Sequence, residues 1–120
     1  MISDDHGLDN LLLLDGEIIE QARGFWVKFD AKQVEPSVGR PHGIKYSLSL
    51  HDESGKRLLG FDNAHAISEG RGYSHRHVIE YDHEHTLKHQ IIPYTYRGAE
   101  QLMVDFWDAV DTAMERLLRE

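Results

Sequence analysis

Residues 44–51, which read IKYSLSLH, constrain the fold of this chain more than any other segment. Every second side chain in the segment is large and apolar: Ile44, Tyr46, Leu48 and Leu50. Because successive side chains of a β-strand point to opposite faces, this period of two predicts a strand with one buried face. The chain must therefore supply a second layer that covers this face.

The C-terminal segment supplies such a layer. Within residues 98–119, apolar side chains recur at intervals of three and four positions, namely at Leu102, Phe106, Val110, Ala113 and Leu117. This spacing places them on one side of an α-helix, and mostly polar residues occupy the other side. We therefore predict an amphipathic helix that lies on a sheet.

Two further strands are predicted before residue 44. Residues 11–14 are four consecutive leucines and are predicted to form a first strand, which Asp15-Gly16 would end in a hairpin turn. A long second strand is predicted over residues 17–29, because apolar and polar side chains alternate in its last part. Gly24 would mark a bulge in this strand.

The remaining strands follow residue 51. Residues 57–63 (RLLGFDN) are predicted to run back along the strand 44–51. Residues 64–73 predict an irregular loop, and residues 74–81 predict another strand. A last strand over residues 90–96 carries Pro93, which lacks the N–H that an internal strand donates, so we expect it at an edge of the sheet.

These elements together predict an α+β protein with an antiparallel sheet of five to six strands and one C-terminal amphipathic helix packed on a face. A chain of 120 residues has the size of one domain. We expect a single domain over residues 1–120, with residues 1–8 loosely ordered, the sheet within residues 11–96 and the helix at residues 98–119.

Composition excludes several kinds of protein. The chain has no cysteine, which excludes disulfides and thiolate metal sites. Its formal net charge of −8 argues against broad binding to a phosphate backbone but leaves room for a small basic pocket. No apolar run approaches the roughly 18 residues of a membrane span, and the acidic N-terminus differs from a secretory signal. We predict a cytoplasmic protein with no membrane partner.

Residues 73–85, YSHRHVIEYDHEH, contain two His-X-His pairs. On the predicted strand, His75 and His77 point to the same face. One hypothesis is acid–base cleavage of RNA, in which these two histidines serve as base and acid. A cation from Arg71, Arg76 or Lys45 would stabilise the charge on the phosphate. This chemistry requires no cofactor.

A metal site is the alternative. Imidazole is the commonest metal ligand, and His75 and His77 could bind a divalent ion such as Zn²⁺, Mg²⁺ or Mn²⁺. Candidates for a third ligand are Asp62, Asp82, Glu84 and His65. The histidines could equally be solvent-exposed groups on a polar hairpin with no role in chemistry. For Asp62 and Asn63, local pattern favours a turn, and Asp62 gains a function only if the loop brings it near His75.

The order of short motifs along the chain is distinctive. The Asp15-Gly16 turn is followed by HGIKYSL, a strand ending in GFDN, a glycine-rich loop leading to HRH, then PYTY and AEQLMVDFWDAV. This order, over residues 11–111, resembles the TumE family of bacterial toxin–antitoxin toxins. In that family a Y-D-N strand end leads through a short loop to an Asp-His-Arg-His motif. The most specific part of the resemblance is GFDN followed by HRH.

The resemblance assigns site residues one by one. It marks Asp62, Asn63, His75, Arg76 and His77, and less firmly Lys45 and Tyr46. On this basis the expected catalytic residues are His75, His77 and Asp62, and the expected substrate-binding residues are Arg76, Arg71, Asn63 and Lys45. Ser74 stands where the family commonly has Asp, and the loop before it is longer than usual. His83 and His85 have no counterpart in the motif and are interpreted as a peculiarity of this chain.

The resemblance implies a small cytoplasmic toxin that is encoded beside an antitoxin and neutralised by direct binding. RNA cleavage is expected only by analogy with other small toxins. The alternative function is that of a non-catalytic protein that binds a metal or a partner. The expected partners are the cognate antitoxin protein and RNA as a substrate, and a second copy of the chain is a further candidate.

Overall fold

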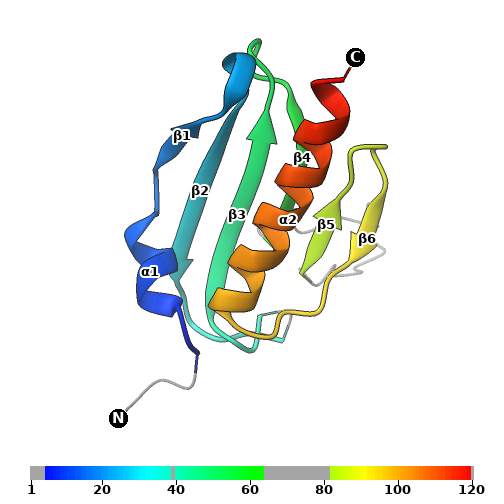
Figure 1. The fold of residues 1–120 in the computed structure, drawn as a ribbon. Helices are drawn as coiled ribbons and strands as arrows, with labels where there is room; N and C mark the ends of the chain where they lie inside the picture. The colour runs from blue at the N-terminus through cyan, green and yellow to red at the C-terminus, as the bar shows by residue number, and fades with distance from the viewer. Residues whose placement is uncertain (1–4, 39, 64–81, 120) are drawn as a thin grey trace, which may run out of the picture.

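The computed structural model describes residues 5–38, 40–63 and 82–119. These residues form one six-stranded antiparallel sheet and two α-helices (Figure 1). The elements in chain order are α1 (Leu8–Leu13), β1 (Ile18–Glu20), the short 3-10 helix η1 (Ala22–Gly24), β2 (Trp26–Gln33), β3 (Ile44–His51), β4 (Arg57–Asp62), β5 (His83–His85), β6 (Ile91–Pro93) and α2 (Ala99–Leu117). The predicted α+β class, with an antiparallel sheet and a C-terminal helix, is confirmed.

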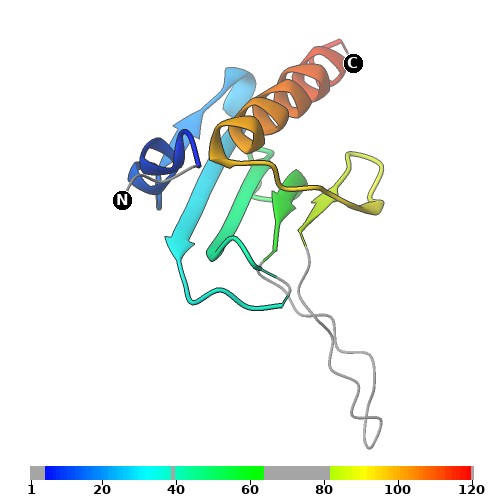
Figure 2. The ribbon, with the colours of Figure 1, turned by 90° about the horizontal axis from the view of Figure 1, so that it is seen from below.

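Both helices lie on the same side of the sheet (Figure 2). The core lies between them and the sheet, and it contains the alternate apolar side chains of β2, β3 and β4 together with the apolar stripe of α2. Phe106 of α2 meets Phe29 and Phe61 edge to face, with ring centroids 5.5 Å and 6.3 Å apart. The apolar side chains that recur every second residue in the strand 44–51 therefore pack against those that recur about every 3.6 residues in the helix, and together they form one apolar layer.

The described strands follow one another in the sheet in the order β1-β2-β3-β4-β5-β6, so each pairs with the described strands before and after it in the sequence. Among the described residues, no helix covers the face of the sheet opposite α1 and α2. We call this the open face. Register and alternation place on it Trp26, Lys28, Lys45, Ser47, Ser49, His51, Arg57, Asp62, His83 and His85.

The N-terminal segment differs from its prediction. Residues 11–14 do not form a strand; Leu11 to Leu13 belong to α1, and Leu11 is fully buried. Four consecutive leucines carry no alternation, and burial of one side of a helical turn decides the outcome here. Asp15-Gly16 then links α1 to β1 and does not close a hairpin. The Gly16 N–H donates to the Phe29 carbonyl at 2.7 Å, and Asp15 Oδ1 accepts from the Ala31 N–H at 2.9 Å.

The predicted long strand over residues 17–29 is two strands, because β1 and β2 pair with each other. The chain reverses at η1, where Arg23 and Gly24 both have positive φ angles, of 58° and 83°. Gly24 therefore lies in a turn and not in a bulge. At the other end of the sheet, β6 is an edge strand that contains Pro93, as predicted. The predicted loop 64–73 and strand 74–81 lie outside the described residues.

The two helices are joined through the N-terminal segment. Asp5 Oδ1 accepts from the Ala99 N–H at the start of α2, and Asp5 Oδ2 accepts from the Tyr96 hydroxyl, both at 2.6 Å. The Glu100 N–H donates to the His6 carbonyl at 2.9 Å. Gly7 has a φ of 83° and lies so close to α2 that a Cβ on it would be 3.0 Å from the Glu100 Cα. These contacts hold residues 5–7 against the start of α2.

In the described part of the chain, neither helix has the length and apolar character that crossing a membrane requires.

Candidate functional site

The open face carries a buried carboxylate, that of Asp62, the last residue of β4. Leu59 and Phe61 of this strand point into the core, so Gly60 and Asp62 point to the open face. Asp62 is only 1% exposed. A carboxylate is rarely buried to this degree without a charged or hydrogen-bonding partner, because leaving water costs a charged group several kcal/mol or more.

The partners of Asp62 come from the neighbouring strand β5. His83 lies directly opposite Asp62, and His85 lies opposite Gly60. Because Gly60 has no side chain, the His85 imidazole has room to lean toward Asp62. His83 Nε2 is 2.8 Å from Asp62 Oδ1, and His85 Nε2 is 3.2 Å from Asp62 Oδ2. The two imidazole centroids are 4.8 Å apart.

Arg57, at the start of β4, contributes a cation to the same place. Its Nη1 donates to Asp62 Oδ2 at 3.4 Å, and its side chain is 35% exposed. The imidazoles are more enclosed, with the side chains of His83 and His85 exposed by 12% and 17%. We call Asp62, His83, His85 and Arg57 the Asp62 cluster. It is partly open to solvent and combines acid–base groups with a fixed positive charge.

One oxygen of Asp62 has unusual surroundings. Oδ1 is buried, and among the described residues it accepts no hydrogen bond of acceptable geometry. His83 Nε2 is within 2.8 Å of it, so the two atoms are close while the direction of a ring N–H is wrong for a hydrogen bond. The arrangement brings two potential ligand atoms together.

Asp62, His83 and His85 are also the residues that could hold a metal ion. Each offers one ligand atom, and these three atoms all lie within 4.8 Å of one another. The sequence-based candidates for metal binding were His75, His77 and Asp62. The structure retains Asp62 in such a group and adds His83 and His85, whereas His75 and His77 lie outside the described residues.

A second polar network lies beside the cluster and holds neighbouring strands together. His42 Nε2 is 3.0 Å and 3.2 Å from the two carboxylate oxygens of Asp82. The Asn63 amide donates to the Ile44 carbonyl at 2.7 Å and to Asp82 at 3.3 Å, and it accepts from the Tyr46 N–H at 3.0 Å. This network fixes the end of β4 to the start of β3. Burial, reinforced by the nearby Asp82 carboxylate, raises the pKa of the Tyr46 hydroxyl, so Tyr46 stays neutral.

The sequence-predicted site residues are thus only partly brought together. Asp62 faces the open face, but Asn63 is fully buried and its amide is used within the fold. Lys45 is exposed on the open face, opposite Lys32 of β2. Arg71, Ser74, His75, Arg76 and His77 lie outside the described residues, so their roles remain predictions.

The structure also adds His83 and His85, which the sequence interpretation set aside. Their spacing of two positions gave the same signal as His75 and His77, namely two imidazoles on one face of a strand. The segment around them is very polar, which is typical of a loop or a ragged hairpin end, but it forms β5 between β4 and β6.

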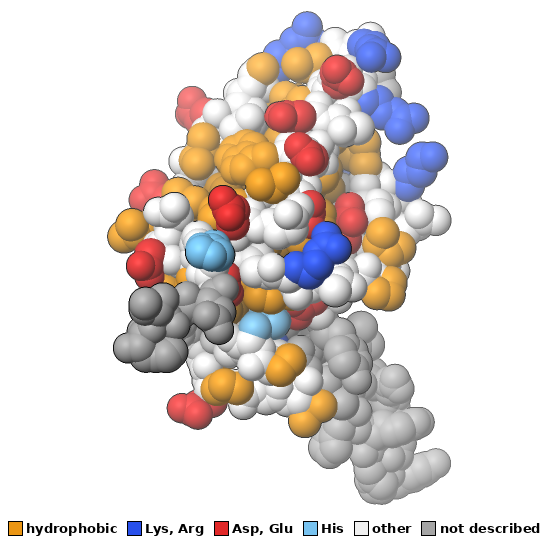
Figure 3. All heavy atoms as spheres, turned by 60° about the horizontal axis from the view of Figure 1, so that its bottom comes forward, with side chains coloured by type: hydrophobic (Ala, Val, Ile, Leu, Met, Phe, Trp, Pro, Cys, Tyr) orange, Lys and Arg blue, Asp and Glu red, His pale blue; other side chains and the backbone are white. Residues whose placement is uncertain are grey.

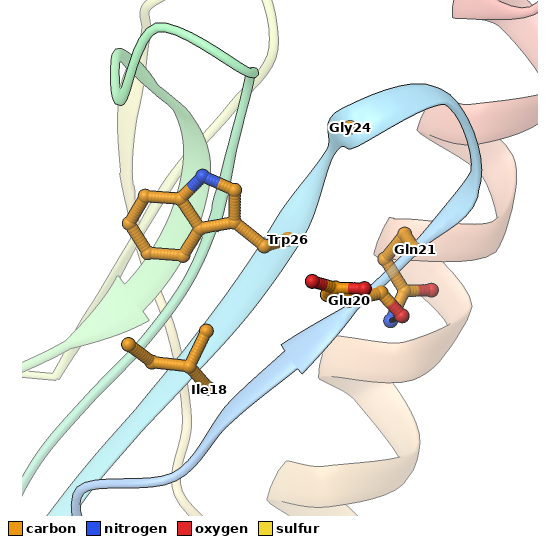
Figure 4. Close-up of a pocket in the computed structure, with 5 residues that line it drawn as sticks. All are labelled: Ile18, Glu20, Gln21, Gly24 and Trp26. Carbon is orange, nitrogen blue, oxygen red and sulfur yellow. Dashed lines mark hydrogen bonds between the residues drawn. The ribbon is translucent and has the colours of Figure 1, made fainter.

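At the far end of the open face there is a pocket beside Trp26. Ile18, Glu20, Gln21, Gly24 and Trp26 line it, and its volume is about 310 Å³ (Figure 4). The Trp26 ring stacks on the His51 imidazole at 4.1 Å between centroids, with the planes 6° apart. The pocket offers a flat aromatic surface on the same face of the sheet as the Asp62 cluster.

The fold and the site define a small α+β protein with helices on one face of a sheet and a histidine–aspartate cluster on the other. The family model described as Toxin TumE matches residues 17–114, so the chain belongs to the TumE toxin family. It is therefore a toxin of a toxin–antitoxin system, and the family implies an antitoxin as its partner. A search of the curated proteins and a search of the solved structures each returned no significant match.

Proposed function

We propose that this toxin acts by cleaving RNA, and that the Asp62 cluster forms part of its catalytic site. The observation that carries the proposal is the convergence of two imidazoles and a guanidinium on one buried carboxylate, with closest distances of 2.8 to 3.4 Å. Membership of a toxin family supports a damaging activity. Cytoplasmic RNA, in the compartment where an antitoxin would also be present, is a target that imidazole and guanidinium groups can attack.

Cleavage of RNA has two chemical requirements that the cluster can meet. The attacking oxygen must lose a proton, and negative charge that builds on the phosphate must be neutralised. Imidazole suits the first requirement, because an unperturbed imidazole changes its charge near neutral pH. Arg57 suits the second, because its guanidinium is partly exposed beside the histidines. His75 and His77 remain sequence-based candidates for the same acid–base roles.

The open face also offers a place for the rest of the substrate. Trp26 lies two strands away from Asp62 and four residues further along, a separation of about 16 Å from strand geometry. Stacking of a base on an aromatic ring contributes about 1–3 kcal/mol and suits single-stranded nucleic acid. A nucleotide next to the one that is cut could therefore be held in the Trp26 pocket.

Charge limits the kind of RNA binding that we propose. On the surface in Figure 3, which is seen from the helix side and from below, acidic side chains are spread over the middle, and most lysines and arginines lie toward the top and upper right. With a formal net charge of −8, the chain is unsuited to a long RNA duplex with many phosphate contacts. We propose instead a short single-stranded substrate, bound through a few cations of the open face such as Arg57 and Lys45.

The test is induced expression in bacteria with and without the cognate antitoxin. Cultures would express wild type, Asp62→Asn, His83→Ala, His85→Ala or Arg57→Gln, and total RNA would be examined from the same cells. His75→Ala and His77→Ala belong in the same series. His6→Ala is the matched control, because His6 is exposed and lies outside the cluster. Thermal unfolding of each purified variant separates loss of activity from loss of folding.

We expect growth arrest and fragmented RNA with wild type and His6→Ala, and neither with the folded cluster variants. Growth arrest with intact RNA would refute RNA cleavage while leaving the toxin assignment in place. Fragmented RNA in all three variants of Asp62, His83 and His85 would show that the cluster is not part of the catalytic site.

A further inference from the structure

We propose that Asp62, His83 and His85 bind one divalent transition-metal ion, for which Zn²⁺ is the probe. The ion's role in catalysis rests on the proposed RNA cleavage, but its binding can be tested without it. Three features of the described residues support the site: the kind of ligands, their separation, and the state of the buried carboxylate.

The ligands come from two adjacent strands and are held by sheet geometry. His83 and His85 alternate with Glu84, so both imidazoles share the open face, and Asp62 is the cross-strand partner of His83. Their positions depend on backbone pairing and not on a loop. Such a rigid arrangement favours metal binding because little conformational entropy is lost when the ligands converge.

The separations suit a first-row ion. For Zn–N and Zn–O bonds of about 2.0–2.1 Å in a tetrahedral site, ligand atoms lie roughly 3.3 Å apart. His83 Nε2 and His85 Nε2 lie 2.8 Å and 3.2 Å from the two oxygens of Asp62, and the three ligand atoms selected as a group lie within 4.8 Å. Small side-chain rotations would bring the three atoms around one ion.

Asp62 supplies the independent observation. Its side chain is 1% exposed, and its Oδ1 accepts no hydrogen bond of acceptable geometry from the described residues. Its Oδ2 has Arg57 at 3.4 Å, which is a long contact. An ion bound at Oδ1 would satisfy that oxygen and offset the cost of burying its charge.

The ligand types select the class of ion. Two imidazoles and one carboxylate suit Zn²⁺, Mn²⁺, Fe²⁺ or Co²⁺, whereas Mg²⁺ and Ca²⁺ prefer oxygen ligands alone. Three protein ligands also leave at least one position for water or a phosphate oxygen, as in catalytic metal sites. With the ion bound, the Nε2 atoms of His83 and His85 would be ligands and could not accept a proton. An ion of this class would take over that role by activating water, and it would polarise a phosphoryl oxygen. Arg57 beside it would then contact the same phosphate.

The experiment uses the full chain without a histidine tag, treated with a chelator and then dialysed. Calorimetric titration with ZnCl₂ measures stoichiometry and affinity, and elemental analysis after dialysis against equal concentrations of Zn²⁺ and Mg²⁺ measures selectivity. The ligand variants are Asp62→Asn, His83→Ala and His85→Ala, and His75→Ala and His77→Ala are measured beside them. The controls are His6→Ala and His51→Ala; His51 lies on the open face but stacks on Trp26. Circular dichroism checks that each variant is folded.

We expect one Zn²⁺ per chain and no retained Mg²⁺. Loss of a group that only orients a ligand typically weakens binding about 10–100-fold, so loss of a ligand should weaken it by about 100-fold or more. Both controls should bind as wild type does. If a ligand variant fails to fold, His83→Gln and His85→Gln replace it, and loss of the Zn²⁺-dependent rise in Tm is the readout.

Absence of stoichiometric Zn²⁺ binding would overturn the proposal, and so would unchanged affinity in all three ligand variants. Binding that is lost in His75→Ala or His77→Ala but kept in His83→Ala and His85→Ala would move the site to the sequence-predicted pair. Failure of the two proposals is distinguishable. If the protein binds Zn²⁺ through these residues but leaves RNA intact, the metal site stands and RNA cleavage is refuted. If the protein binds no Zn²⁺ and cleaves RNA in the presence of a chelator, RNA cleavage stands and the metal site is refuted.

Discussion

Asn63 offers the sharpest test of how the site is held in place. Its side chain is fully buried, and its amide contacts two backbone groups of β3, the Tyr46 N–H at 3.0 Å and the Ile44 carbonyl at 2.7 Å. Tyr46 and Ile44 are both 1% exposed. The amide therefore replaces backbone pairing at the point where β4 ends beside Asp62.

Replacement of Asn63 by Ala would leave both backbone groups buried without these partners. Each unsatisfied buried group costs about 1–3 kcal/mol, so we expect the free energy of unfolding to fall by about 3 kcal/mol. That is a large share of the roughly 5–15 kcal/mol that stabilises an ordinary domain. With a urea dependence of roughly 2 kcal/mol per M, the midpoint of unfolding should fall by about 1.5 M.

The assay is equilibrium unfolding in urea, followed by tryptophan fluorescence and by circular dichroism. Asn10→Ala is the control, because Asn10 is exposed on α1, and it should change stability by less than about 0.5 kcal/mol. Asn63→Asp should be at least as destabilising as Asn63→Ala, because it places a second carboxylate beside Asp82 and removes the donor to Ile44. A loss below about 1 kcal/mol in Asn63→Ala would refute the reasoning, since one unsatisfied group alone reaches that value.

Three further outcomes follow from other contacts. Asp5→Ala should lower the free energy of unfolding by about 1–2 kcal/mol, because it removes the acceptor for the Ala99 N–H and the Tyr96 hydroxyl; urea unfolding measures the loss, and an unchanged midpoint would contradict it. Gly7→Ala should lower the free energy of unfolding by at least about 1 kcal/mol, because the φ of Gly7 is 83° and the new Cβ would press on Glu100. Gly55→Ala is the control: its φ is also positive but its surroundings are open, so it measures the backbone strain without the contact. Burial, and then the nearby Asp105, raise the pKa of Glu84. The folded state therefore binds the Glu84 proton more tightly than the unfolded state does. As a result, the free energy of unfolding falls as pH rises from the ordinary pKa of Glu to the raised pKa. Glu84→Gln should therefore unfold at a higher temperature than wild type at neutral pH, with the difference shrinking or reversing in mild acid; an advantage independent of pH would contradict the assignment.

The parts of the fold that were predictable are those in which one periodicity is sustained. Residues 44–51 alternate without interruption, and residues 98–119 keep a helical stripe for several turns, so both elements follow from their side chains. Pro93 identified an edge strand because a missing N–H has a direct meaning in a sheet.

The parts that were not predictable depend on contacts that no short window contains. Leu11 is helical because α1 fills a space beside α2 and β2, which four identical residues cannot reveal. Residues 17–29 divide because Arg23 adopts a positive φ, which is uncommon for a residue with a Cβ.

The candidate site also has a part that was predictable from the sequence and a part that was not. Asp62 was singled out from a motif, and its position at the end of β4 agrees with the predicted strand. Its pairing with His83 depends on β4 and β5 being neighbours although 20 residues separate Asp62 from His83 in the sequence. Only the register of the two strands brings Asp62 opposite one imidazole and Gly60 opposite the other.

The position of α2 after all six strands has a consequence for synthesis in the cell. The apolar side of the sheet is covered by Leu102, Phe106 and Val110, which leave the ribosome later than every strand. A nascent chain that has completed β6 therefore displays an uncovered apolar surface until the helix emerges, and such surfaces favour aggregation or capture by other proteins. Because α2 covers the apolar side of the sheet, we expect the open face and its cluster to become stable only after α2 has docked.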